Sequence, residues 1–71
     1  MIELIGDSPC IKGIRVCRIF MWEMRGESMR DLEKMYPSLT KGEILDALTF
    51  AAKNPALMKA EIAKEHMAVR L

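Results

Sequence analysis

Two helix-start motifs separated by a proline constrain the fold of this chain most strongly. Ser28 stands three residues before an aspartate, and Thr40 stands three residues before a glutamate, a spacing typical of capping boxes. Pro37, between the two motifs, prevents the first helix from continuing because its ring clashes with the preceding helical turn. The motifs therefore predict one helix over residues 29–36 and a second over residues 41–53, joined by a tight turn.

The segments on either side of this helix pair predict an N-terminal β element and two further helices. Residues 2–5 alternate loosely and run into a cluster of turn formers, and a second extended piece spans residues 10–12. Helical periodicity begins near Val16 and stops at Gly26. A last helix begins at about residue 56, after the Asn-Pro pair that ends the preceding one. Three short helices with tight turns fit a trihelical bundle, and the second and third have helix-turn-helix spacing.

The short length of the chain predicts one domain that associates with other chains. With 71 residues there is room for a single domain, and such a chain buries only roughly 60% of its unfolded surface. Yet 51% of the residues are apolar and seven are Met. We expect a mostly α fold, with a helix-turn-helix-like domain and its β arm over residues 1–55 and a C-terminal partner-binding or dimerisation helix over residues 56–71. The apolar surplus favours a homodimer or a partner protein.

Helical wheels predict which side chains face the core. The helix that begins near Val16 is apolar nearly all round, as helices sandwiched between neighbours are. Its broad face holds Val16, Cys17, Phe20, Met21 and Met24, and the opposite side holds Ile19 and Trp22. The predicted core stripe of helix 41–53 is Ile44, Leu45, Leu48, Ala51 and Ala52.

The last helix has two apolar stripes. One holds Met58, Ile62 and Val69, and the other holds Ala60, Ala63, Met67 and Leu71. One stripe can pack on the bundle, and the second then requires a partner chain or a second copy.

Several classes of function find no support in the sequence. Cys10, Cys17 and His66 are too few and too far apart for a zinc site, and no nucleophile or phosphate loop stands in a motif. We therefore expect no enzyme activity, no metal, no cofactor and no small-molecule substrate. Reduced thiols, the absence of a signal segment and the absence of a long apolar run predict a cytoplasmic protein with no membrane partner.

DNA is one candidate partner. The net charge of +1 gives no overall electrostatic signal, and Glu43 and Asp46 make helix 41–53 a poor reader of bases. Phosphate contact is more plausible through a basic set beside it. That set is Lys12, Arg15, Arg18, Arg25 and Lys41. The alternatives are an ordinary solvated ridge, or Arg15 paired with a carboxylate such as Asp7.

A protein is the other candidate partner. Phe50 lies on the polar side of its helix, so it is either covered by the last helix or a second copy, or exposed as an anchor. The predicted partner-binding residues are Trp22, Phe50, Met58, Ile62 and Val69.

Three runs of the sequence resemble a known family: PCIKGIRVCRI, then RGES, then YPSLTKGEILDALTFAA. The chain is similar over residues 9–52 to the prokaryotic domain-of-unknown-function family 433, whose members read P-x-I-x-G-T-R-I-x-V, Gly-x-Ser, Y-P-x-L-T and A-L-x-Y-A. The resemblance implies a homeodomain-like trihelical fold with a short β element. Ile14 replaces the family's usual Thr, and Asp7-Ser8 replaces its usual Gly-Lys, which weakens a DNA role for Lys12 and Arg15.

The resemblance also implies a function, because members are often antitoxin partners of PIN-like nuclease toxins. The leading hypothesis is an antitoxin that binds and neutralises such a toxin through helix 56–71 and regulates its own operon as a dimer. It predicts that a chain ending at Pro55 folds in part and loses the toxin. The alternative is a DNA-binding transcriptional regulator, whose binding falls steeply with salt and is weakened by Arg15→Ala and Arg18→Ala.

Overall fold

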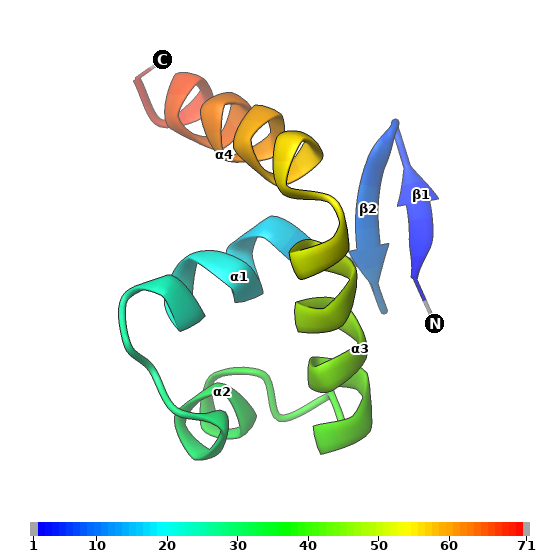
Figure 1. The fold of residues 1–71 in the computed structure, drawn as a ribbon, viewed down its shortest axis with the longest axis vertical. Helices are drawn as coiled ribbons and strands as arrows, with labels where there is room; N and C mark the ends of the chain where they lie inside the picture. The colour runs from blue at the N-terminus through cyan, green and yellow to red at the C-terminus, as the bar shows by residue number, and fades with distance from the viewer. Residues whose placement is uncertain (1, 71) are drawn as a thin grey trace.

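The part of the chain that the structure describes folds into a small antiparallel sheet followed by four helices (Figure 1). The structure is a computed structural model that describes the backbone of residues 2–70 and the side chains of residues 2–65. The strands are β1 (Glu3–Ile5), β2 (Ser8–Ile11) and β3 (Ile14–Arg15). The helices are α1 (Val16–Met24), α2 (Met29–Met35), α3 (Lys41–Lys53) and α4 (Pro55–Arg70). The predicted mostly helical fold with a short N-terminal β element is confirmed.

Two tight turns build the sheet and fix its place against the helices. β2 lies between β1 and β3, and both pairings are antiparallel. Gly6 and Asp7 form the first turn with φ angles of 55° and 68°, and Lys12 and Gly13 form the second with φ angles of 49° and 80°. Positive φ at both central residues is the type I′ pattern, which matches the twist of a hairpin. The residue pairs that close the turns are Ile5 with Ser8 and Ile11 with Ile14.

Both predicted capping boxes are formed. The Ser28 hydroxyl accepts a hydrogen bond from the backbone N–H of Asp31 at 3.2 Å, and the Asp31 carboxylate accepts one from the backbone N–H of Ser28 at 3.2 Å. In the second box the corresponding distances between Thr40 and Glu43 are 3.1 Å and 2.8 Å. Each box satisfies backbone donors that a helix start leaves open. The two boxes therefore set where α2 and α3 begin.

The core lies where α1 meets the sheet and the other three helices, and Figure 1 shows α1 between α4 and α2. Its buried members are Ile11, Val16, Cys17, Ile19, Leu32, Leu39, Ile44, Ala47, Ala51 and Met58. The predicted orientation of α1 is wrong at two positions. Ile19, expected on the far side, is 0% exposed, and Met24, expected on the core face, is 62% exposed. A helix that is apolar all round has no polar face to orient it, so the neighbouring elements decide which side is buried.

The faces of α3 and α4 also differ in part from the wheels. Leu45, expected in the core stripe of α3, is 48% exposed, whereas Ala47, three residues after Ile44 and four before Ala51, is fully buried. On α4 the first predicted stripe packs inward, because Met58 is 1% exposed and the half-buried Ile62 lies against the core. Ala60 of the second stripe is exposed. The described part of α4 therefore uses its larger apolar side chains to hold the fold.

Two findings limit the kinds of site in the described residues. No helix there is long and apolar enough to cross a membrane. No group of three or more His, Cys, Asp or Glu side chains is placed there to hold a metal ion. Cys10 and Cys17 are free and buried, and burial raises the pKa of both thiols. A raised pKa keeps a thiol protonated and unreactive at neutral pH.

Candidate functional site

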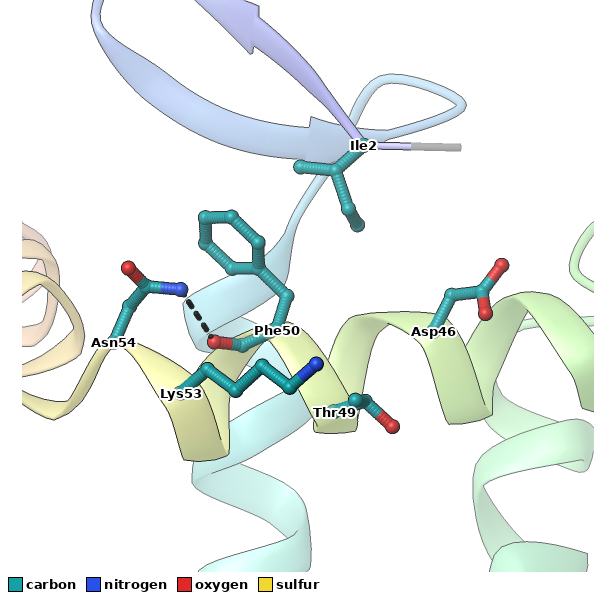
Figure 2. A pocket seen from close by; sticks show the side chains of 6 residues that line it. All are labelled: Ile2, Asp46, Thr49, Phe50, Lys53 and Asn54. Atoms are coloured by element: carbon teal, nitrogen blue, oxygen red, sulfur yellow. Dashed lines mark hydrogen bonds between the residues drawn. The ribbon is translucent and has the colours of Figure 1, made fainter.

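A shallow hollow on the outer side of α3 is one candidate site (Figure 2). It has a volume of about 310 Å³ and is lined by Ile2, Asp46, Thr49, Phe50, Lys53 and Asn54. Phe50 projects from α3 toward Ile2, which precedes β1, so the ring is half-buried against the start of the chain. The side-chain amide of Asn54 donates a hydrogen bond to the Phe50 carbonyl oxygen at 2.8 Å and closes the end of the helix. The start of the sheet, and not the last helix, therefore lies over Phe50.

The exposed side of α3 extends this hollow into a larger surface. Leu45 lies four residues before Thr49, so the two side chains share one face of the helix. Leu45 is 48% exposed, while Asp46 and Lys53 add one charge of each sign. We call this surface the α3 face and define it by the residues Ile2, Leu45, Asp46, Thr49, Phe50 and Lys53. It mixes apolar and charged side chains and has none of the Arg, Asn or Gln side chains that make the commonest bidentate base contacts.

The second candidate site is a charged cluster between α1 and α4. Arg15 Nη1 donates to Glu65 Oε1 at 2.7 Å, and Arg18 Nε and Nη2 donate to Glu65 Oε1 and Oε2 at 3.3 Å each. The Glu65 side chain is 10% exposed, whereas those of Arg15 and Arg18 are 43% and 61% exposed. Hydrogen bonds from Arg18 and Arg15 hold the pKa of Glu65 below its ordinary value. The same carboxylate raises the pKa of Arg18.

The other predicted DNA-binding residues do not join this cluster. Lys12 Nζ lies 3.1 Å from Glu43 Oε1 and 3.3 Å from the Ser38 carbonyl oxygen, so it ties the second turn of the sheet to the start of α3. The Arg25 guanidinium stacks 5.3 Å from the centre of the Trp22 ring at the end of α1. Lys41 is exposed in the first turn of α3. The predicted basic set is therefore not gathered in one place, and three of its members face carboxylates of the same chain.

A second buried carboxylate lies one helical turn before Glu65. The Glu61 side chain is 1% exposed, its Oε2 accepts from Lys64 Nζ at 3.0 Å, and its Oε1 has no hydrogen-bond partner among the described side chains. Burial raises the pKa of Glu61, but the adjacent Ser8 hydroxyl, Lys64 and Arg15 outweigh it, so the net shift is downward. Glu61 and Glu65 both lie on the side of α4 that faces the core. Charged contacts of these carboxylates and the packing of Met58 both hold α4 against the rest of the fold.

Comparison with known proteins identifies the family. The family model described as "Protein of unknown function (DUF433)" matches residues 3–51, which is more than half of the chain. The chain belongs to the DUF433 family. Neither the comparison with curated proteins nor the comparison with solved structures gave a match.

Each of the two candidate sites lies partly inside and partly outside the region that matches the DUF433 model. It runs from β1 to Ala51, so it includes Arg15, Arg18 and most of the α3 face. Lys53 and all of α4, with Glu61 and Glu65, lie beyond it. The charged cluster therefore joins two arginines within the matched region to a carboxylate outside it.

The predicted partner-binding residues differ in how far they are buried. Met58 is 1% exposed and packs inside the chain, so its burial does not fit a partner contact. Trp22, Phe50 and Ile62 are half-buried and pack against the core with one side open. The side chain of Val69 lies outside the described residues. Of the predicted partner-binding residues with described side chains, Trp22, Phe50 and Ile62 are therefore partly open to solvent and Met58 is not.

Sequence reasoning missed Glu61 and Glu65. A signal was present, because these two residues fall at helical spacing from Met58 and Ile62, on one of the two apolar stripes of the helix. A carboxylate on a core stripe requires a cation or hydrogen-bond donors to be buried. The arginines that supply them stand 50 and 47 positions earlier in the chain.

Proposed function

We propose that this chain is a cytoplasmic binding protein of the antitoxin type, which holds and neutralises a PIN-like nuclease through the α3 face. The observation that supports this proposal most is the exposure of Leu45, at 48%, next to the hollow over Phe50. An exposed leucine side chain is unfavourable in water. Covering it with a partner stabilises the complex by about 25 cal/mol per Å² of apolar surface buried. The role is binding and not catalysis.

The state of the basic residues favours a protein partner over DNA. Arg15 and Arg18 share one carboxylate, and Lys12 lies against another. A DNA backbone carries one negative charge per roughly 1.7 Å of helix axis. It would have to approach these cations beside Glu65 and Glu43, which repel it. A protein partner needs only local complementarity.

The apolar surface of the chain supports association as well. The large apolar side chains that the structure leaves exposed are Leu4, Ile5, Met24, Met35 and Leu45. Leu4 and Ile5 lie in β1, whose outer edge has no neighbouring strand in the described part of the chain. An open edge with apolar residues is a ready place for pairing with a second copy. We therefore include a homodimer in the proposal.

The anchoring of α4 changes how the proposal has to be tested. A chain that ends at Pro55 lacks Met58, Glu61 and Glu65, and so loses a core side chain and the carboxylate that holds Arg15 and Arg18. Loss of nuclease binding in that truncation would follow from unfolding alone. Single substitutions on the α3 face leave the core intact and are the better test.

The test is a growth assay in a bacterial host that expresses the PIN-like nuclease gene encoded beside this one. We expect the wild-type chain to restore growth and Leu45→Lys to fail, because a charge replaces an apolar contact. Glu33→Lys is the matched control, since it also adds a positive charge at an exposed helical position, on α2. Circular dichroism checks that both variants fold. The proposal is wrong if no such gene stands beside this one, or if Leu45→Lys protects as well as the wild type.

A DNA-binding transcriptional regulator is the second candidate. The helix-turn-helix arrangement of α2 and α3 and the 61% exposure of the Arg18 side chain favour it. It predicts duplex binding whose affinity falls steeply with salt, with a slope that decreases when Arg18 or Lys41 is replaced by Ala. Absence of binding at low salt would remove this candidate.

A further inference from the structure

Beside the charged cluster lies a hollow of about 470 Å³ that the α3 face does not include. It is lined by Gly13, Ile14, Arg15, Arg18, Tyr36 and Glu65. The residues come from the second turn of the sheet, β3, α1, the end of α2 and the inner side of α4. Segments far apart in the sequence therefore build its wall.

The charge of this hollow is positive. Two arginines face one glutamate, and the Glu61 carboxylate nearby is paired with Lys64. Burial raises the pKa of Tyr36, so its hydroxyl stays neutral and can donate a hydrogen bond. α1 begins beside the hollow with neither a side-chain cap nor an acidic residue in its first turn, so the positive end of its dipole is not offset there. Among the side chains that the structure describes, the equivalent of one cation at the hollow has no counterion.

The arginines also keep donors for a second anion. A guanidinium has five N–H donors, of which Glu65 takes one from Arg15 and two from Arg18. Both side chains remain at least 43% exposed, so their other N–H groups are open to an incoming group. Planar guanidinium groups match the geometry of carboxylates in particular.

We propose that this hollow is a carboxylate-binding site, which receives an acidic side chain of the protein partner beside Glu65. The step from a carboxylate site to a partner's side chain rests on the proposed function. A single surplus positive charge fits one carboxylate. A run of DNA phosphates is disfavoured because one surplus positive charge neutralises only one of its many phosphates.

The test uses the full chain labelled with ¹⁵N and follows the Nε–H signals of Arg15 and Arg18 by NMR. Sodium acetate is added against sodium chloride at equal ionic strength. We expect saturable shifts with acetate only, and an affinity that falls about tenfold or more in Arg18→Gln, since a charge-assisted hydrogen bond is lost. Arg30→Gln on α2 is the control and should bind acetate as the wild type does. Shifts that do not saturate, or that chloride reproduces, contradict the site.

Two further arms separate this inference from the proposed function. A short DNA duplex that saturates the Arg18 signal at lower concentration than acetate would overturn the choice of a carboxylate. With the neighbouring nuclease as probe, we expect Arg18→Gln to weaken binding about tenfold and Arg30→Gln to leave it unchanged. If Arg18→Gln leaves the nuclease affinity unchanged, the hollow does not receive an acidic side chain of the partner, although it can still bind carboxylates. Acetate binding without any nuclease binding contradicts the proposed function and supports the carboxylate site.

Discussion

Replacing Glu65 with Gln removes the charge that joins α4 to α1 while keeping the size of the side chain. The stability that depends on this charge can be worked out from the contacts. The Arg15 contact at 2.7 Å is short, and the two Arg18 contacts at 3.3 Å are long. Exposed ion pairs contribute about 0.2–1 kcal/mol, whereas breaking a fully buried pair costs about 3–5 kcal/mol. Because the Glu65 side chain is nearly buried and its arginines are partly exposed, we expect the free energy of unfolding to fall by about 1.5 kcal/mol at pH 7.

The pH dependence of this loss follows from the lowered pKa of Glu65. A carboxylate whose pKa is lower in the folded chain contributes its stability above the pKa of the unfolded chain, whose ordinary value is 4.5. That contribution disappears as the pH falls through the lower pKa of the folded state. Wild type and Glu65→Gln should therefore differ most at neutral pH and converge in acid.

The assay is urea unfolding followed by circular dichroism at pH 7 and at about pH 3. With an m-value of about 1 kcal/mol/M for so small a protein, the midpoint at pH 7 should fall by about 1.5 M. Glu33→Gln, at an exposed position of α2, is the matched control and should change stability by less than about 0.5 kcal/mol. Our account of the cluster is refuted if Glu65→Gln leaves the midpoint unchanged at pH 7, or if a shift persists undiminished in acid.

Three further predictions concern the core, a helix cap and the thiols. Met58→Ala should cost about 2–4 kcal/mol in urea unfolding because it opens a cavity at a 1% exposed position, and Met58→Leu should cost less than about 1.5 kcal/mol; equal costs would contradict the burial. Thr40→Ala should cost about 1 kcal/mol by the same assay, while Thr40→Ser should cost little, and a neutral Thr40→Ala would argue against the second capping box. Cys10 and Cys17 should react with iodoacetamide far more slowly in the folded chain than in urea, and equal rates would show that they are accessible.

The helix bounds could be predicted from the sequence because local signals determine them. Ser28 and Thr40 cap α2 and α3 through contacts within four residues, and Pro37 ends α2 without help from the rest of the chain. The turn before α4 is marked in the same local way. These features depend on sequence neighbours, so a single sequence contains the information.

The orientation of the helices could not be predicted in the same way. Ile19 and Met24 exchange the places expected of them because α1 has only two polar residues, Arg18 and Glu23, to mark a solvent side, and its neighbours decide which apolar side chains are covered. The exposure of Leu45 likewise depends on how α3 sits on α1.

The charged cluster was out of reach for a related reason. Lys12, Arg15 and Arg18 were recognised as a basic set, but the carboxylates that meet them stand far away in the sequence. Glu65 lies 50 positions after Arg15, and nothing near either residue indicates the pairing. The net charge of a surface therefore depends on tertiary contacts, which cannot be read from the charges of neighbouring residues in the sequence.

The central claim is our proposal that the α3 face binds a protein, and it is tested most directly by calorimetric titration of the full chain with the proposed partner, a PIN-like nuclease encoded by a neighbouring gene. We expect a saturable complex at physiological salt, an affinity at least about tenfold lower for Leu45→Lys, and no change for Glu33→Lys. A nuclease that does not bind, or that binds Leu45→Lys as tightly as the wild type, would contradict the claim. If the chain instead binds a DNA duplex with a steep salt dependence, the result would favour the second candidate, a DNA-binding transcriptional regulator.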